Sequence, residues 1–315
     1  DKTKALELFD GWMKTKKFVP KSFYNNKREI GDVNGVYFPY WLYDTTVHVD
    51  LDREGSRRYT MTEGDYRVTY EKHFRIIRKG DLGIKNLPKI ALSKSNKILV
   101  ESVYPFDFNT AINFEATYLS GFVAENKDIP KEDLTASINE DVLAYSTNVV
   151  KESMTGESVS VVNSDFSTEQ GTFSYAMLPV WTVTYNDKES EKNYFFSING
   201  QSGKVVGELP LDMLKLCLSG LLVAVPILAI ITLILYFTGN LSTNTFIFGL
   251  IAAVIVYLGY VVTINNDYKM KSASVKNRVV NQIAFNNNYS ERIEYSKDID
   301  LGTRVVGREK IERKN

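Results

Sequence analysis

Two uncharged apolar runs in the last third of the chain restrict its fold more than any other feature. The first, 216–237, has 22 residues and the second, 246–264, has 19. A helix of about 20 apolar residues crosses the hydrocarbon core of a bilayer. The alternative, a buried hairpin in a soluble domain, requires two core helices of this length and uniform apolarity in succession. The runs therefore predict transmembrane helices over 213–237 and 246–264, joined by an external loop, 238–245.

Small residues recur four positions apart within both predicted spans. Gly220 is followed by Ala224 in the first span, and Gly249 by Ala253 in the second. This spacing lets two helix backbones approach closely. Chance pairs of this kind are common in apolar runs, but the short polar link makes the two spans antiparallel neighbours. The spacing therefore predicts that the helices pack against each other at these four residues.

Basic residues flank the spans on one side only. Lys215 precedes the first span and Lys269 and Lys271 follow the second, whereas the loop 238–245 has no Lys or Arg. Cytoplasmic flanks of membrane helices carry an excess of Lys and Arg. The sequence therefore predicts a multi-pass protein of the cell membrane, with the large N-terminal region and the tail, 265–315, in the cytoplasm.

The tail has no apolar run long enough to form a core of its own. It is rich in Asn, Ser, Lys, Arg and Glu. A short amphipathic helix is expected near 272–285, and we expect most of the remainder of the tail to be mobile or loosely docked.

The N-terminal region, 1–210, has the pattern of a soluble α+β domain. Helix-forming residues dominate 3–17 and 131–153. Aromatic and β-branched runs separated by Gly, Asn and Asp turns fill much of the rest, which is typical of antiparallel strands. Tight turns join these runs in place of regular helical crossovers. We therefore predict a domain dominated by antiparallel sheet.

The pattern Pro-x-Trp occurs twice before an alternating strand, at 39–41 and at 179–181. Each copy follows a predicted helix at some distance. The repeat favours a duplicated helix-plus-sheet unit, with halves 1–125 and 126–210.

No group of residues has the spacing of a known catalytic or metal site. Cys217 is the only cysteine, and the two histidines, His48 and His73, lie in strand-like segments. The run from Gly200 to Lys204 resembles the end of a phosphate-binding loop, but Val205 stands where Ser or Thr would bind magnesium, so a hairpin turn is favoured. The 38 basic residues balance the 38 acidic ones, so charge gives no direct evidence for nucleic-acid binding. The sequence predicts no enzyme, and no cofactor or metal within this chain.

Five segments cover nearly all of the soluble region in order. They are KKFVPKSF (16–23), GVYFPYWLYD (35–44), YPFDFNTAINFEATYLSGFVAE (104–125), YAMLPVWTVTY (175–185) and YFFSINGQSGKVVGELP (194–210). These segments resemble a family of bacterial membrane proteins often labelled TFIIB-type zinc ribbon-containing proteins. The resemblance implies one or two cysteine-rich zinc ribbons upstream of Asp1, so zinc is expected only in such an N-terminal segment. The strand-turn-strand at 181–207 also looks like the repeat of PepSY-type domains.

These observations predict a non-enzymatic, membrane-anchored cytoplasmic protein that binds or scaffolds a partner. The expected partners are the lipid bilayer and another membrane or cytoplasmic protein. The candidate contact residues are aromatic: Tyr104, Phe106, Phe108, Tyr118 and Phe122. Burial in the core is the competing interpretation of these residues. The alternative functions are a membrane-bound regulator whose upstream zinc ribbon binds nucleic acid or protein, and, more remotely, an enzyme acting on a lipid or peptide.

Overall fold

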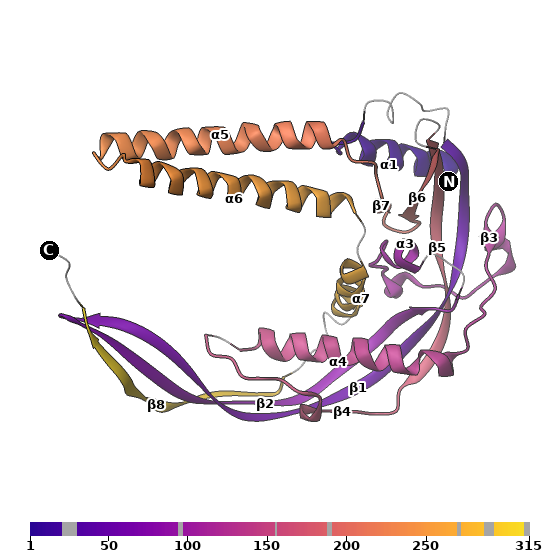
Figure 1. Cartoon of the computed structure of the whole chain (residues 1–315). Helices are drawn as coiled ribbons and strands as arrows, with labels where there is room; N and C mark the ends of the chain where they lie inside the picture. The colour runs from indigo at the N-terminus through magenta and orange to yellow at the C-terminus, as the bar shows by residue number, and fades with distance from the viewer. Residues whose placement is uncertain are drawn as a thin grey trace.

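The computed structural model describes residues 1–20, 30–93, 97–154, 156–187, 191–269, 272–286 and 293–311. Its chain forms an open C (Figure 1). A curved antiparallel sheet makes the back and the lower arm of the C, and a pair of long helices makes the upper arm.

The chain contains both α-helices and β-strands. The α-helices are α1 (Lys2–Lys14), α3 (Lys97–Glu101), α4 (Thr135–Glu152), α5 (Met213–Phe237), α6 (Thr243–Tyr268) and α7 (Ser272–Asn286). Short 3-10 turns are η2 (Phe108–Thr110), η3 (Ala116–Leu119), η4 (Lys131–Leu134) and η5 (Asn163–Asp165). The strands are β1 (Ile30–Glu63), β2 (Tyr66–Ile90), β3 (Val123–Ala124), β4 (Phe166–Thr168), β5 (Thr172–Asp187), β6 (Lys192–Asn199), β7 (Val205–Gly207) and β8 (Tyr295–Lys310).

One long hairpin dominates the sheet. β1 and β2 pair in antiparallel register from Tyr40–Ile90 to Glu63–Tyr66. The turn between them contains Gly64, whose φ of +61° favours glycine. The order of strands is β7-β6-β5-β1-β2-β8, with β3 and β4 also paired with β1. The predicted α+β class, with a dominant antiparallel sheet and two long apolar helices, is therefore confirmed.

Both predicted halves of the soluble region contribute to this one sheet, because β1 pairs with β2 on one side and with β5 on the other. The two Pro-x-Trp motifs lie on neighbouring strands: Trp41 pairs with Tyr175, and Trp181 pairs with Gly35. The strands that carry them differ in length, since β1 has 34 residues and β5 has 16. The duplication therefore stays a hypothesis.

The main core lies between the inner face of the sheet and helices α4 and α7. Tyr40 of β1 and Leu82 of β2 are fully buried in it. Helix α4 contributes Ile138 and Val142, which are four residues apart and therefore share one face of the helix. The two helices therefore cover the inner face of the sheet.

A smaller core cluster joins α1 and β6 to the base of the long helices. Phe9 of α1 lies against Phe196 of β6, with ring centroids 4.8 Å apart. Tyr268, the last residue of α6, is buried in the same cluster. The end of the second long helix is therefore packed on the sheet domain.

The tail returns to the sheet domain, so the expectation that the tail outside its helix is mobile or loosely docked is wrong for β8. The amphipathic helix is present as α7, and its Val279 and Ile283 are buried in the main core. β8 extends the sheet by pairing with β2 from Lys310–Tyr66 to Tyr295–Lys79. Backbone hydrogen bonds and charge pairs attach β8 to β2. Neither kind of contact requires apolar residues, so the strand has no apolar pattern in the sequence.

The sheet domain therefore does not end at residue 210. Helices α5 and α6 are inserted between β7 and α7. The segments on both sides of this insertion belong to one sheet and one core. The domain is built from two separate stretches of sequence, one before and one after the long helices.

Candidate functional site

The two long helices pack along their small residues, as the sequence predicts. Within the apolar part of α5 and α6, Gly220, Ala224, Gly249 and Ala253 are buried. A Cβ added at Gly220 would lie 2.7 Å from the ring of Tyr257, and one at Gly249 would lie 3.1 Å from Ile231. Larger side chains would therefore push the helices apart. The pair is an apolar helical hairpin with close backbone contact.

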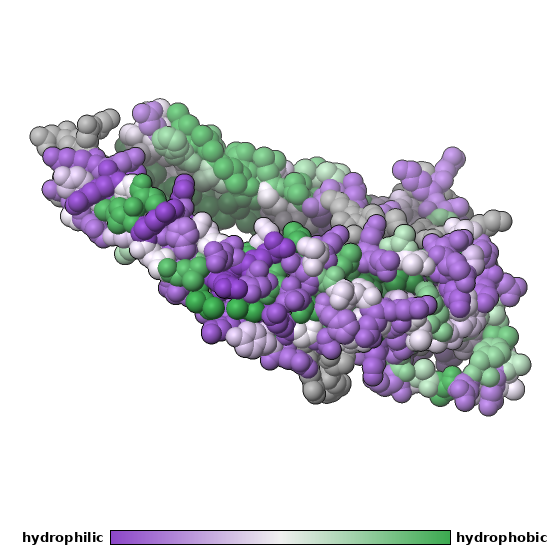
Figure 2. Space-filling model, turned by 90° about the horizontal axis from the view of Figure 1, so that it is seen from below, coloured by the Kyte–Doolittle hydropathy of each residue, from purple (hydrophilic) through white to green (hydrophobic). Residues whose placement is uncertain are grey.

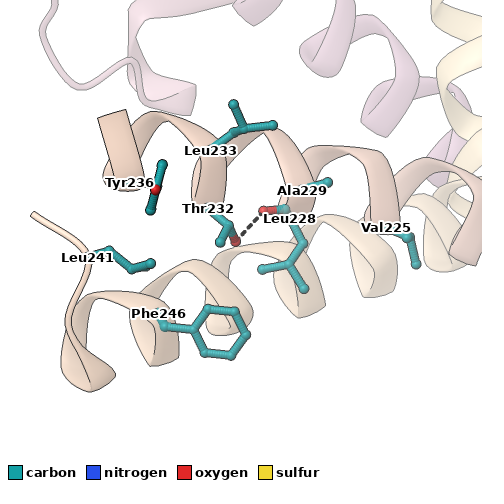
Figure 3. A pocket seen from close by; sticks show the side chains of 8 residues that line it. All are labelled: Val225, Leu228, Ala229, Thr232, Leu233, Tyr236, Leu241 and Phe246. Carbon is teal, nitrogen blue, oxygen red and sulfur yellow. Dashed lines mark hydrogen bonds between the residues drawn. The ribbon is translucent and has the colours of Figure 1, made fainter. Parts of the chain in front are cut away.

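The outer surface of this hairpin is apolar along its length. Both helices are long and apolar enough to span a membrane. Only 11% of the most apolar 18-residue stretch of each helix is buried within the protein. A groove near the hairpin turn is lined by Val225, Leu228, Ala229, Thr232, Leu233, Tyr236, Leu241 and Phe246 (Figure 3). The Thr232 hydroxyl in this groove donates to the Leu228 carbonyl at 2.8 Å, so its hydrogen bond is satisfied within the helix.

Both ends of the hairpin meet at one short segment of the sheet domain. The Tyr268 hydroxyl at the end of α6 accepts the N–H of Phe18 at 3.0 Å. Before α5, the N–H of Asp212 donates to the Phe18 carbonyl at 2.8 Å, and Lys215 Nζ donates to the Val19 carbonyl at 3.0 Å. The start and the end of the hairpin therefore lie beside the same residues.

An apolar loop, 108–124, projects from the back of the sheet. Ile112 is 73% exposed, Phe114 is 62% exposed and Tyr118 is 41% exposed. Glu115 is the only charged side chain in the loop. Hydrophobic residues gather at the end of the molecule in Figure 2 where Figure 1 places β3. Exposed apolar clusters of this kind mark interaction sites in soluble domains.

The far end of this loop is fixed by an aromatic cluster. The ring of Phe122 contacts those of Tyr37 and Trp181, with centroids 4.9 Å from each. Gly35 lies beside Phe122, and a Cβ added there would come within 2.6 Å of that ring. The close approach therefore requires glycine at position 35.

The near end of the loop is fixed by two glutamines. Gln201, in the turn between β6 and β7, accepts from the N–H of Asp107 at 2.7 Å and donates to its carbonyl at 2.9 Å. Gln282 of α7 accepts from the N–H of Phe106 at 2.6 Å and donates to its carbonyl at 2.8 Å. The loop is thus held at both ends while its apolar tip faces solvent.

Two of the five candidate contact residues do not lie at the surface. Tyr104 is 1% exposed and Phe106 is 2% exposed, so both belong to the main core and the predicted contact surface is wrong for them. Phe108 is half-buried against that core, and Phe122 is half-buried in the aromatic cluster with Tyr37 and Trp181. Tyr118 alone is exposed.

The most exposed large apolar residues of the loop, Ile112 and Phe114, are not among the five predicted contact residues. They stand in a run of small and polar residues that has neither helical nor strand periodicity. An apolar residue in such a run has no obvious core to enter. That is the signal by which the sequence could have identified them.

The histidines lie in charge pairs on the sheet. His48 Nδ1 is 2.5 Å from Asp81 Oδ1, and His48 Nε2 is 3.1 Å from Glu169 Oε1. Hydrogen bonds to Asp81 and then to Glu169 raise the pKa of His48. The carboxylates bind opposite nitrogens and do not converge on one point. In the described part of the chain, no three His, Cys, Asp or Glu side chains are placed to hold a metal ion.

The glycine-rich segment is a hairpin turn, as predicted. β6 and β7 pair on either side of it. The side-chain oxygen of Asn199 accepts from the N–H groups of Gln201 and Ser202, both at 2.8 Å. The Lys204 ammonium donates to the Tyr104 carbonyl. The backbone donors and the lysine that a phosphate would need therefore serve the fold.

Glu71 of β2 connects the strands on its two sides. Its carboxylate accepts from Arg58 Nε on β1 at 2.9 Å and from Arg304 Nη2 on β8 at 2.6 Å. The Glu71 side chain is 6% exposed. Hydrogen bonds from Arg304 and Arg58 lower the pKa of Glu71 to about 2. Glu71 is therefore charged at neutral pH and helps to attach β8.

Comparison with known proteins gives one relative without a described activity. The chain is 30% identical over 212 residues to an uncharacterized protein, YdjG, of Bacillus subtilis (strain 168). The aligned region covers 67% of this chain and 61% of that protein, so the chain spans about three fifths of the relative's length. No family model matches the chain. No solved structure matches it either.

Proposed function

We propose that the protein is a membrane-anchored scaffold without catalytic activity of its own. In this proposal α5 and α6 cross the cell membrane, the sheet domain and the tail lie in the cytoplasm, and the loop 108–124 binds a partner protein. The observation that carries the proposal is the combination of an apolar hairpin with a preformed apolar loop elsewhere on the same domain.

The surface of the hairpin supports the anchoring. Leu222 is 78% exposed, Phe237 is 77% exposed and Phe248 is 70% exposed. Side chains of this kind are unfavourable in water over so large an area, and a bilayer would cover them. The spans carry no charged residue from Leu216 to Phe237, which agrees with the high cost of a charge in hydrocarbon.

The contacts at the base of the hairpin support a topology in which the domain and the tail lie on the same side of the membrane. A chain that enters and leaves the bilayer beside Phe18 and Val19 must have both flanks on one side. Lys215 and Lys269 at these flanks favour the cytoplasmic side, while the link 238–242 is uncharged. Lys271, the third basic residue of the prediction, lies outside the described residues.

Membrane insertion also requires a change of angle at the base of the hairpin. The hairpin and the ribbon formed by β1, β2 and β8 extend in the same direction (Figures 1 and 2). The ribbon carries exposed charges such as Arg57, Arg58 and Glu63. Each charge at the bilayer centre costs about 3 kcal/mol or more. We therefore expect the ribbon to stay in water and the hairpin to tilt away from it.

The surroundings of the loop indicate the chemistry of its partner. The segment from Asp107 to Asp133, both included, has six acidic residues and two basic ones. The two basic residues, Lys127 and Lys131, lie over aromatic rings of the sheet. The segment therefore has an excess of negative charge, which favours a partner whose apolar groove has a rim of Lys and Arg. Because the loop lies at the opposite end of the molecule from the hairpin turn (Figure 1), we propose a soluble protein as the partner.

Affinity capture with the full chain tests this function. Phe114→Asp should reduce recovery of the partner at least tenfold, because a charge replaces the exposed ring at the tip of the loop. Phe195→Asp is the matched control, since Phe195 is 50% exposed on β6, away from the loop. A protein recovered with the wild type and with Phe195→Asp, but lost with Phe114→Asp, supports the proposal. Equal recovery by all three chains contradicts it.

A further inference from the structure

The hairpin interrupts the sheet domain in sequence. The segment before it ends with β7, and the segment after it begins with α7. α7 packs on β2, on α3 and on α4, which all precede the hairpin. The domain is therefore complete only when residues from beyond α6 return to it.

Helix α7 supplies part of the main core. Ile283 is fully buried, Val279 is 4% exposed and Gln282 is fully buried. Gln282 also satisfies both main-chain groups of Phe106. Asn286 donates to the Asn86 carbonyl at 3.0 Å. Without α7, buried apolar side chains and backbone groups of the preceding segment would face water.

Strand β8 supplies the partners of two buried charges. Arg78 is 1% exposed, and it donates to Asp298 at 2.6 Å and to the Ser153 carbonyl at the end of α4 at 3.0 Å. Glu71 binds Arg304. A buried charge that loses its partner is strongly destabilising. β8 also covers the backbone edge of β2 from Tyr66 to Lys79, which would otherwise be an open template for aggregation.

We propose that the sheet domain completes its fold only when α7 and β8 lie on the same side of the membrane as β2 and α4, so that a chain with a single inserted span cannot complete it. When both helices cross, α7 and β8 return to the side on which β2 and α4 lie. When only one crosses, α7 and β8 stay on the opposite side and the domain remains incomplete. This inference rests on the proposed membrane anchoring. It adds that a chain with only one inserted span has an incomplete sheet domain.

The position of the partner-binding loop, 108–124, also depends on the return of the tail. Gln282 holds Phe106 at the root of the loop, and Gln201 holds the adjacent Asp107. One of these two contacts comes from beyond the hairpin. The loop is therefore fully positioned only in a chain whose tail lies on the domain side, so half-inserted copies recruit partners less well.

Variants with different numbers of spans test this inference. The full chain has two spans. A one-span variant lacks 243–268, which sends α7 and β8 to the opposite side of the membrane. A zero-span variant replaces 213–268 by a flexible Gly/Ser linker, which keeps both segments on the same side. Amide hydrogen exchange at residues 66–79 of β2 measures completion of the sheet in each.

The expected result is protection with zero or two spans and loss of protection with one. We expect exchange at 66–79 to be at least a hundredfold faster in the one-span variant than in the full chain. Addition of a peptide of residues 272–311 to the domain side of one-span proteoliposomes should restore protection. Native protection in the one-span variant without the peptide, or loss of protection in the zero-span variant, overturns the inference.

Carbonate extraction separates failure of this inference from failure of the proposed anchoring. If the wild-type chain is released from membranes by carbonate, the hairpin is not an anchor and the proposed function fails. If the wild-type chain stays in the membrane while the one-span variant keeps its protection, the anchoring stands and the folding inference fails.

Discussion

Gln282 forms two hydrogen bonds to the backbone of Phe106, a residue 176 positions earlier in the chain. The amide oxygen accepts the Phe106 N–H at 2.6 Å and the amide nitrogen donates to the Phe106 carbonyl at 2.8 Å. This pair connects the helix that follows the apolar hairpin to the root of the exposed loop. It therefore joins the proposed membrane anchor and the proposed binding surface within one core.

Gln282→Ala should destabilise the full chain by about 2 kcal/mol or more, because it leaves the buried Phe106 N–H and carbonyl without partners. Asn281→Ala is the matched control on the exposed side of the same helix, and it should change stability by less than about 0.5 kcal/mol. Denaturant unfolding of both variants in detergent micelles measures the difference. Equal stability of the two variants would show that the Gln282 contact is dispensable.

Gly220→Val should weaken the packing of the hairpin by about 1–3 kcal/mol, because the added side chain meets Tyr257 of the opposite helix. Gly259→Val is the control, since a Cβ at Gly259 has no neighbour within 4 Å. The distance between spin labels on the two helices, with Cys217→Ala as background, reports their separation. A wider distance for both variants, or for neither, would contradict the described interface.

Acid should release β8 before it unfolds the rest of the sheet. The folded-state pKa of Glu71 is lowered from 4.5 to about 2 by Arg304 and Arg58. A lowered pKa contributes stability that is fully present above pH 4.5 and is lost as the pH falls towards about 2. The protection factors of the amides at 66–79, which correct for the intrinsic pH dependence of exchange, should therefore fall across this window in the wild type. The fall should be smaller in Glu71→Gln, which has no carboxylate to protonate, and an identical profile would exclude Glu71 as the cause.

The hairpin turn should lie farther from the ribbon turn in a bilayer than it does in the structure. Spin labels at Gly64→Cys and Ser242→Cys, again with Cys217→Ala, report the distance between the two turns. Double electron–electron resonance in nanodiscs should give a longer distance between the two labels than their separation in the structure, because the charged ribbon stays in water. A distance equal to that in the structure would contradict the proposed tilt.

The sequence was sufficient for the features that depend on local pattern. The two apolar helices, the close contact at Gly220 and Gly249, the α+β class and the turn at Gly203 all follow from composition and spacing. The helix α7 was also predicted, but its place in the core was not. That place depends on Val279 and Ile283, two aliphatic side chains in a polar segment, and on partners far away in sequence.

The candidate site was predictable only in outline. The segment 104–122 was identified as aromatic, but the pattern does not distinguish Phe106, which enters the core, from Phe114, which faces solvent. That difference arises because Gln282 and the main core take up the first residues of the segment. β8 was missed for a related reason, since a strand that docks through backbone bonds and charges has no apolar alternation. The predicted likeness at 16–23 includes residues 21–23, which lie outside the described residues.

The central claim is that the sheet domain and the tail share one side of the membrane and that only the hairpin turn reaches the other. Single cysteines at Gly64, Ser242 and Ser296, each with Cys217→Ala, place one thiol on the domain, one on the hairpin turn and one on β8. An impermeant thiol reagent applied to intact cells should label position 242 alone, and permeabilised cells should show labelling at all three positions. Labelling of positions 64 and 296 with 242 protected would invert the protein, and labelling of only one of 64 and 296 would contradict the shared sheet domain itself.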